Sequence, residues 1–247
     1  METYFNIRYE FEPEAVHAAI AERLKQPGAD YICVADGVIL NEANRHPDYL
    51  ATVNGGMFSI CDSSYVPLYI KNIYGRTRSQ YCGSQIFIDI VRQRRYRMAF
   101  LGTQQPILNG LRTQLTAENP DVADMLFYEL PFRAVADFDY PAIARMLEAD
   151  GAEIIWVALG APKQEQFMQR LKPYLSHGVM IAVGAAFKFF SGTEVNRAPE
   201  WMVRHHLEFV HRIYKEPRKQ LKRCGWIILT LPRLYLQERR RARQHKE

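Results

Sequence analysis

The sequence has few cysteines, no long apolar run and no recognisable export segment. Its four cysteines are scattered over 247 residues and none forms a CxxC pair, so neither a zinc site nor a redox dithiol is indicated. Reduced thiols in a cytosolic protein are the simplest interpretation. No window reaches the roughly 18 uninterrupted apolar residues of a membrane-spanning helix. The N-terminus lacks the basic start, apolar stretch and small-residue cleavage site of a secretory signal.

The composition is that of a globular protein, with 48% hydrophobic and 24% charged residues, which argues against wholesale disorder. The net charge of +5 is unevenly distributed. Residues 204–247 carry 13 Lys and Arg against 4 Asp and Glu, a charge of +9, and the rest of the chain carries −4. A basic tail of this kind predicts an anionic partner, which is a nucleic acid, an anionic bilayer or a phosphorylated substrate.

The tail also contains an apolar run, CGWIILTLPRLYL at 224–236, flanked by basic residues. The run is too short to span a bilayer. It can lie in a membrane interface, with Trp226 and Tyr235 at headgroup depth and the cations on anionic lipids. The alternative is that the apolar residues pack on the core and the charges face water. The basic density favours the membrane, whereas nucleic acid is disfavoured because no recognisable binding module accompanies the tail.

Apolar strands alternate with amphipathic helices along most of the chain, which predicts an α/β fold with a largely parallel sheet. We expect strands at 30–40, 55–64, 97–104, 125–130, 152–160 and 179–187, the first of which runs into a turn at Asp36 and Gly37. We expect helices at 12–25, 46–53, 85–93, 106–118, 140–150 and 163–175. Three strands end in glycine, at Gly102, Gly160 and Gly184. Ligands of open α/β sheets bind at the carboxyl ends of strands, where glycine lets a ligand approach the backbone.

One of these turns places polar groups at the start of a helix. In WVALGAPKQEQFMQRL, residues 156–171, the apolar run ends at Gly160, and Lys163, Gln164 and Glu165 follow Pro162 directly. Lys163 would lie in the first helical turn, where the helix dipole disfavours a cation. From the pattern alone, an ordinary helix start with a solvent-facing lysine is the simpler interpretation, and a bound ligand is the alternative.

Several segments resemble motifs of one family, the WecG/TagA/CpsF glycosyltransferases. The three most specific are VALGAPKQEQFM at 157–168, IAVGAAFKFFSGTEVNRAPEWM at 181–202 and LEFVHRIYKEPRK at 207–219. The segments FLGTQQ at 100–105 and ATVNGGMFSICDSSYVPL at 51–68 match more loosely. The resemblance runs in one register over roughly residues 5 to 223.

The resemblance implies a Rossmann-like α/β core, at 1–195, and a basic helical C-terminal appendage, at 196–247, that closes the site and docks on the membrane. It implies an inverting transfer from a UDP-sugar to a polyprenyl-diphosphate-linked saccharide, typically of N-acetylmannosamine or its uronic acid onto N-acetylglucosamine. The expected place is the cytoplasmic membrane face, during assembly of a cell-surface polysaccharide such as teichoic acid or capsule. Expected partners are these two substrates and an anionic membrane surface bound through 204–243, with no metal, cofactor or nucleic acid. The oligomeric state, a homo-oligomer included, stays open.

Asp62 aligns with the proposed catalytic aspartate of the family. An inverting transfer needs a carboxylate that takes the proton from the acceptor hydroxyl, and Asp62 leaves a predicted strand in SICDSS. The alternative role is a helix N-cap ahead of Ser63 and Ser64. Asp36 stands where the family usually has asparagine, and is a substrate contact, a competing base or a turn residue before Gly37.

The remaining expected site residues bind the donor or the lipid diphosphate. Without a metal the leaving diphosphate needs positive charge from the protein, which the resemblance assigns to Lys163 and the start of its helix. Gln164 and Glu165 are expected to hydrogen-bond ribose, uracil or sugar. The turns at Gly102, Gly160, Pro162 and Gly184 complete the donor site, and Arg197, Arg212 and Arg218 are candidate diphosphate clamps. A solvated basic face or lipid contact is the alternative for these arginines.

Two departures from the family pattern bear on the identity of the substrates. Gln85 stands where an aspartate is expected, and Lys188 replaces an aspartate with a cation. Together with the departure at Asp36, they keep a second hypothesis open, a non-catalytic scaffold of a polysaccharide-assembly complex. A nucleotide-dependent dehydrogenase is disfavoured because no GxGxxG opens a helix after the first strand. The histidines at 205, 206 and 211 are interpreted as structural, since no convergent carboxylates or thiols accompany them.

Overall fold

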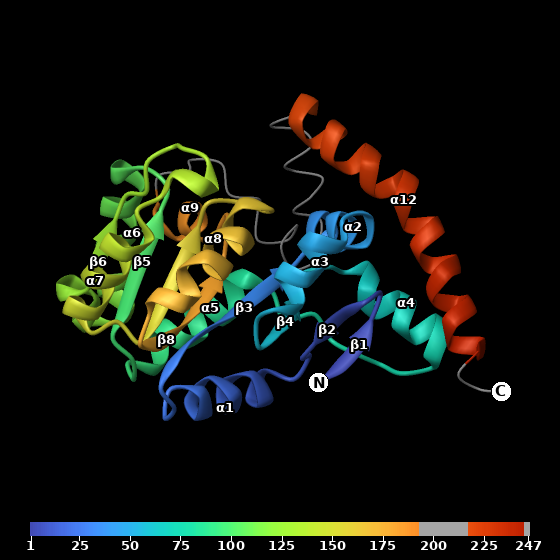
Figure 1. Cartoon of the computed structure of the whole chain (residues 1–247), viewed down its shortest axis with the longest axis horizontal. Coiled ribbons are helices and arrows are strands. Elements are labelled where there is room, and N and C mark those ends of the chain that lie inside the picture. Colours follow the sequence, from blue (N-terminus) through green and yellow to red (C-terminus); the bar gives the residue numbers. More distant parts are fainter. Residues whose placement is uncertain (193–216, 245–247) are drawn as a thin grey trace.

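The computed structural model describes residues 1–192 and 217–244, which form a central sheet flanked by helices (Figure 1). The eight described strands lie in the order β1-β2-β4-β3-β8-β7-β5-β6. They are β1 (Glu2–Tyr4), β2 (Ile7–Tyr9), β3 (Gly28–Ala35), β4 (Phe58–Cys61), β5 (Met98–Gly102), β6 (Leu126–Tyr128), β7 (Ile154–Ala158) and β8 (His177–Ala182). From β2 to β6 every described pairing is parallel, and β1 is antiparallel to β2. The predicted α/β fold with a largely parallel sheet is confirmed.

Helices cover both faces of this sheet. One face carries α1 (Pro13–Arg23), α5 (Gly83–Gln93), α6 (Gln105–Glu118) and α9 (Ala186–Phe190). The other carries α2 (Gly37–Arg45), α3 (Pro47–Asn54), α4 (Tyr65–Tyr74), α7 (Tyr140–Asp150) and α8 (Lys163–Leu171). All residues of β7 are buried, with Trp156 packed into one layer and Val157 into the other. Strands buried on both faces explain the continuous apolar runs in the sequence.

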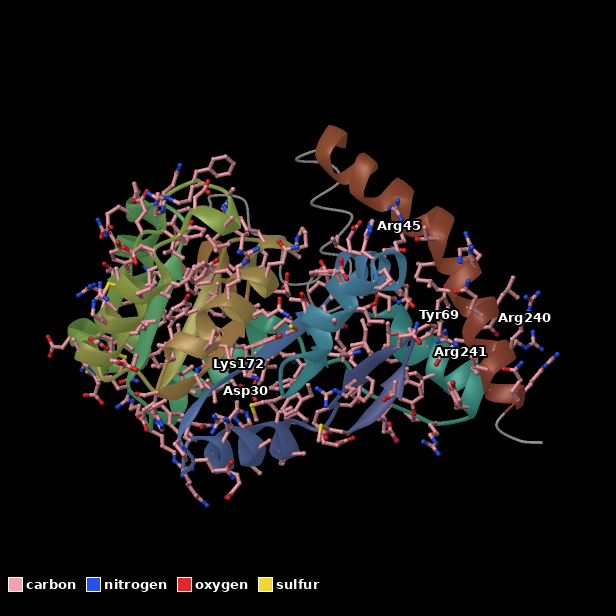
Figure 2. The ribbon with its side chains drawn as sticks, in the orientation of Figure 1. Asp30, Arg45, Tyr69, Lys172, Arg240 and Arg241 are labelled. Carbon is pink, nitrogen blue, oxygen red and sulfur yellow. The ribbon has the colours of Figure 1, made fainter. Side chains whose placement is uncertain are left out.

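The C-terminal helix α12 (Pro217–Gln244) packs along α2 and α4 (Figures 1 and 2). The ring centroids of Tyr235 and Tyr69 lie 5.0 Å apart. The hydroxyl of Tyr74 donates to the buried carboxylate of Glu238 over 2.9 Å. The predicted helical appendage is therefore present, while the predicted boundary at 195/196 falls outside the described residues. Within the described ranges, no helix combines the length and the apolar character needed to cross a membrane.

The observed strands end earlier than the predicted ranges. The strand predicted in 30–40 ends at Ala35, at the predicted turn of Asp36 and Gly37, where Asp36 caps α2 by accepting hydrogen bonds from the backbone N–H groups of Val38 and Ile39 over 2.9 and 3.0 Å. The predicted strand 179–187 ends at Ala182, and its last residues open α9. Short apolar runs are compatible with both the helical and the strand period, so the helix cap and the packing determine where each strand ends. The β1–β2 hairpin and α4 were not predicted.

Candidate active site

The carboxyl edge of the sheet brings most of the predicted site positions together. Asp62 follows β4, Asp36 follows β3, Gly184 follows β8, Gly160 follows β7 and Gly102 ends β5. The sheet order β4-β3-β8-β7-β5 places these five positions in that sequence along one edge. From β5 the chain runs outward through α6 to β6, whereas from β7 it runs the opposite way through α8, on the other face, to β8. The connections therefore diverge between β5 and β7, at Gly102 and Gly160. Such a switch point is where open α/β sheets bind ligands.

Helix N-termini reinforce this edge. The helices that follow β3, β7 and β8 all begin here, and the positive ends of their dipoles favour an anion. The start of α5 lies here too, since a Cβ on Gly83 would come within 3.1 Å of the Val34 side chain and 3.8 Å of Val183. The side chain of Gln85 accepts from the Cys82 backbone N–H over 3.1 Å and closes the first turn of α5. Gln85, one of the two departures, thus has a capping interaction of its own.

Asp62 is half-buried at the end of β4. Its backbone N–H donates to the Ala35 carbonyl over 3.0 Å, which extends the β3–β4 pairing by one residue. The N-cap residue of α4 is Ser64, two residues after Asp62. Burial raises the pKa of the Cys82 thiol and the Asp62 carboxylate raises it further, so that carboxylate lies near the start of α5.

The turn between β7 and α8 is open to solvent and carries a cation. Gly160 has a φ of +79°, and a Cβ there would meet nothing within 4 Å, so a ligand can approach its backbone. The Lys163 ammonium lies 5.0 Å from the centroid of the Phe132 ring and 5.4 Å from that of Phe138. Among the described residues Lys163 forms no ion pair. Its charge is available to an anion at this edge.

The neighbouring polar side chains of α8 point inward. The Gln164 side-chain oxygen accepts from the Gly160 backbone N–H over 3.0 Å, and its amide nitrogen donates to Glu165 over 2.9 Å. The hydroxyl of Tyr49, on α3, donates to the other carboxylate oxygen of Glu165 over 3.0 Å. Glu165 is fully buried (0% exposed), and burial raises its pKa to about 7. Gln164 and Glu165 therefore support the Gly160 turn from inside, and Tyr49 is a member of this network that the sequence did not indicate.

Packing requires glycine at Gly102, whereas Gly184 is favoured only by its positive φ. A Cβ on Gly102 (φ +112°) would come within 2.6 Å of the Ala158 carbonyl oxygen, so the close approach of β5 to β7 requires glycine. A Cβ on Gly184 (φ +49°) would lie 3.6 Å from the Gln164 side chain. Thr103, directly after Gly102, has a φ of +56°, which is rare for a β-branched residue. Backbone in sparsely populated conformations gathers at functional edges of folds.

Comparison with known proteins assigns this arrangement to a family. The sequence matches the family described as "Glycosyl transferase WecG/TagA/CpsF family" over residues 4–246. The chain belongs to this family. It is 23% identical over 227 residues to an N-acetylglucosaminyldiphosphoundecaprenol N-acetyl-beta-D-mannosaminyltransferase of Bacillus subtilis, covering 87% of this chain and 84% of the relative. An enzyme of the same name from Bacillus spizizenii is 26% identical over 199 residues, covering 79% and 75%.

As a WecG/TagA/CpsF member the protein is a glycosyltransferase. Several of its predicted site residues cannot be placed. Arg197, Arg212 and the three histidines lie outside the described residues, and so does the side chain of Arg218, although its backbone belongs to α12. Lys188 is described and is exposed on α9. Within 1–192 and 217–244 no three His, Cys, Asp or Glu side chains are grouped to hold a metal ion.

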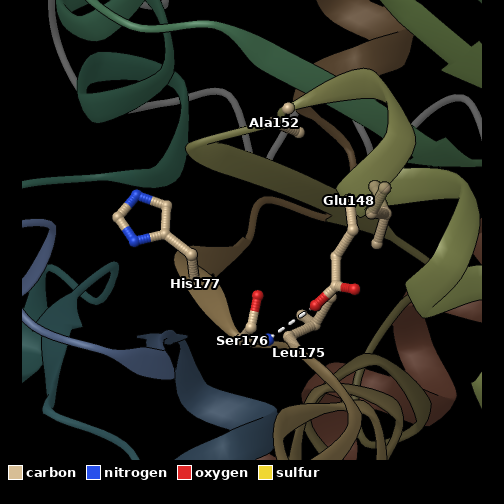
Figure 3. A pocket seen from close by; sticks show the side chains of 7 residues that line it. Glu148, Ala152, Leu175, Ser176 and His177 are labelled. Atoms are coloured by element: carbon tan, nitrogen blue, oxygen red, sulfur yellow. Dashed lines mark hydrogen bonds between the residues drawn. The ribbon is translucent and has the colours of Figure 1, made fainter.

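A pocket lies at the opposite edge of the sheet (Figure 3). Its lining consists of residues at the amino ends of β7 and β8 and on α7, namely Leu147, Glu148, Gly151, Ala152, Leu175, Ser176 and His177. One oxygen of Glu148 accepts from the Ser176 backbone N–H over 2.8 Å. No residue predicted for the glycosyltransferase site lines this pocket, and the topology places it away from the switch point.

Proposed function

We propose that this glycosyltransferase moves N-acetylmannosamine from UDP-N-acetylmannosamine to N-acetylglucosamine on undecaprenyl diphosphate, in the biosynthesis of a cell-surface polysaccharide. The names of the two Bacillus relatives support this donor and acceptor. The observation that carries the proposal is the position of Asp62 and Lys163 on one edge of the sheet, after β4 and β7, with β3 and β8 between them. Three strand spacings separate these positions by about 14 Å, which leaves room for a sugar and a diphosphate.

In the proposed reaction Asp62 is the general base. Its carboxylate takes the proton of the acceptor hydroxyl, and the hydroxyl oxygen attacks the anomeric carbon of the donor from the side opposite UDP. A new glycosidic bond forms as the bond from the anomeric carbon to the diphosphate oxygen breaks, and the configuration inverts. UDP leaves with the bonding electrons. Asp36 directly follows β3 and caps α2 at the same edge, so we assign it to shaping the acceptor side.

The donor diphosphate is proposed to lie over the Gly160–Pro162 turn. The backbone N–H groups at the start of α8 and the Lys163 ammonium face the negative charge that grows on the leaving group. The Gln164 side chain keeps the turn in place from below. The turns at Gly102 and Gly184 flank this space on β5 and β8, and Arg197, Arg212 and Arg218 remain proposed additional clamps for the donor or the lipid diphosphate.

The described part of α12 suits docking on the cytoplasmic face of an anionic membrane. Its exposed side includes the half-exposed Leu236. Arginines surround this leucine, at 233, 239, 240 and 243. These positions follow a helical spacing and share one face. Arginines around an apolar residue combine lipid-headgroup attraction with shallow insertion. We propose that the protein is peripheral on this membrane face, where a lipid-linked acceptor and a nucleotide-sugar donor meet.

The test is release of UDP from a panel of UDP-sugars that includes UDP-N-acetylmannosamine and its uronic acid. The acceptor is polyprenyl-diphosphate N-acetylglucosamine in anionic liposomes, with EDTA present. Acceptor-dependent release with UDP-N-acetylmannosamine is the expected result. Release with another donor would correct the sugar, and silence with every donor, together with no thermal protection by UDP, would favour the non-catalytic scaffold.

A further inference from the structure

Phe132 is a fully exposed aromatic side chain at the carboxyl edge of the sheet. Its relative exposure is 104%, so the described residues leave the ring uncovered on nearly every side. It lies between β6 and the short 3-10 helix η2 (Val135–Asp137), and its neighbours Pro131 and Arg133 are exposed as well. Single exposed apolar side chains are common on protein surfaces. Phe132 differs because it protrudes beside the proposed active site, where a partner can cover it.

The base of this loop is firmly held. Leu130 and Phe138, on either side of the tip, are both buried. The ring of Phe138 packs edge-on against Phe167 of α8, with 5.1 Å between centroids. The Tyr140 hydroxyl donates to the Val135 carbonyl over 2.6 Å. The tip is therefore presented from a fixed base, attached to the same helix that begins with Lys163.

Two cations lie near the exposed tip. The Lys163 ammonium lies over the Phe132 ring at 5.0 Å, and the Arg133 guanidinium lies 5.8 Å from the neighbouring Phe138 ring. An apolar tip flanked by cations is the pattern of a shallow anchor in an anionic bilayer interface. In Figure 1 the yellow-green segment that contains this loop lies at the upper side of the view, toward which β5 runs.

We propose that the Phe132 tip is a second membrane anchor, which inserts into an anionic bilayer interface and, together with α12, sets the carboxyl edge of the sheet against the membrane. The proposal rests on the proposed function, because that function requires a lipid-linked acceptor at this edge. A nucleotide base is a poorer occupant. A base would cover one face of the ring, whereas a bilayer interface covers a protruding side chain from all sides.

The test is sedimentation of the full chain with vesicles of phosphatidylcholine and phosphatidylglycerol, without donor or acceptor. The variant is Phe132→Ala, and the matched control is Tyr174→Ala, which removes a half-exposed aromatic at the opposite edge, on the 3-10 helix η3 (Lys172–Tyr174). Loss of one phenyl ring from the interface should weaken vesicle partition about tenfold, while Tyr174→Ala should leave it unchanged. Phe132→Trp should restore partition, and brominated lipids should quench the new indole.

Partition of Phe132→Ala equal to wild type, or no partition of the wild-type chain, would overturn the anchor. Weaker UDP binding by Phe132→Ala in the absence of vesicles, with partition unchanged, would assign the ring to the nucleotide instead. Thermal melting checks that each variant folds. Sedimentation needs no turnover, so the two proposals can fail separately. If Phe132→Ala lowers partition while the wild-type chain has no transfer activity, the anchor holds and the proposed function is refuted. If the wild-type chain transfers sugar while Phe132→Ala leaves partition unchanged, the proposed function holds and the anchor is refuted.

Discussion

The charged side chains at the two edges of the sheet differ in whether they have ionic partners within the described structure. At the amino edge the fold pairs its own ions, as with Lys172, which lies 2.8 Å from the Asp30 carboxylate and 3.1 Å from the Gly55 carbonyl (Figure 2). Arg97 is similarly engaged by Asp150 at 2.7 Å. At the carboxyl edge the Lys163 ammonium meets aromatic faces rather than a carboxylate in the described structure. An ion pair within the fold contributes to its stability, whereas a cation without an ionic partner in the described structure is a candidate for binding a ligand.

The largest expected effect is on kcat, in a comparison of Asp62 at the carboxyl edge with Asp150 at the amino edge. Asp62→Asn removes the proposed base and should lower kcat by about a thousandfold, because the acceptor hydroxyl keeps its proton, while UDP affinity stays within about twofold. The control is Asp150→Asn, which breaks the pair with Arg97 and should leave kcat unchanged. Steady-state kinetics and calorimetry measure both. A kcat for Asp62→Asn within tenfold of wild type would exclude Asp62 as the base.

The second prediction concerns the buried carboxylate below the Gly160 turn. Burial is the main cause that raises the pKa of Glu165 to about 7, and the Asp36 charge adds to it. The folded protein therefore keeps the proton while the unfolded chain ionises, so this contribution to stability is complete below about pH 4.5 and is lost as the pH rises to about 7. Relative to Glu165→Gln, the wild-type free energy of unfolding should fall by roughly 3 kcal/mol over that interval.

Denaturant unfolding at a series of pH values gives this difference directly. The comparison with Glu165→Gln removes the contributions of all other titrating groups. Tyr49→Phe removes one hydrogen bond to the same carboxylate and should destabilise the chain by about 1 kcal/mol. A difference between wild type and Glu165→Gln that does not vary with pH would show that Glu165 is ionised in the folded protein.

The third prediction compares two lysines. Lys163→Gln should weaken UDP binding about tenfold, since one charge-assisted contact to phosphate is lost, and should flatten the dependence of binding on salt. Lys172→Gln removes an equal charge whose partner is Asp30, and should lower the melting temperature without a change in UDP affinity. Equal UDP affinities in the two variants would remove Lys163 from the donor site.

The smallest effect is expected at the pocket of the amino edge. The Ser176 backbone N–H holds the pKa of Glu148 below its usual value, so its contribution to stability is present at neutral pH and is lost as the pH falls through the lowered pKa. Glu148→Gln should therefore be slightly less stable at neutral pH, and its kcat/KM should match wild type. A reduced kcat/KM would place function in this pocket and break the contrast between the edges.

The order of strands and helices could be read from the sequence because the buried parallel strands are continuous apolar runs and the helices between them are amphipathic. Element ends were harder to predict. The turn at Asp36 and Gly37 was predicted, but the helix α2 that follows it was not, because its cap is visible only when the side chain of Asp36 is placed. The β1–β2 hairpin depends on the pairing of Tyr9 with Ser59 of β4, a contact that is distant in sequence.

The residues of the candidate site that lie in turns or sequence motifs could be predicted from the sequence. Asp62 and Lys163 lie at the ends of strands that the sequence located, and the strand order brings them to one edge. The sequence could not show that Glu165 is buried, since its partner Tyr49 lies 116 residues away in the chain. Phe132 carries no motif, and its role in the argument comes from exposure and from its distance to Lys163.

Hydrogen–deuterium exchange with and without UDP tests the central claim most directly, because it compares both edges in one experiment. We predict that UDP protects the backbone amides of 158–166, at the β7–α8 turn, and leaves those of 147–152 and 175–178 unchanged. Protection confined to 147–152 and 175–178 would place the nucleotide in the pocket at the amino edge and would contradict the assignment of the carboxyl edge as the active site.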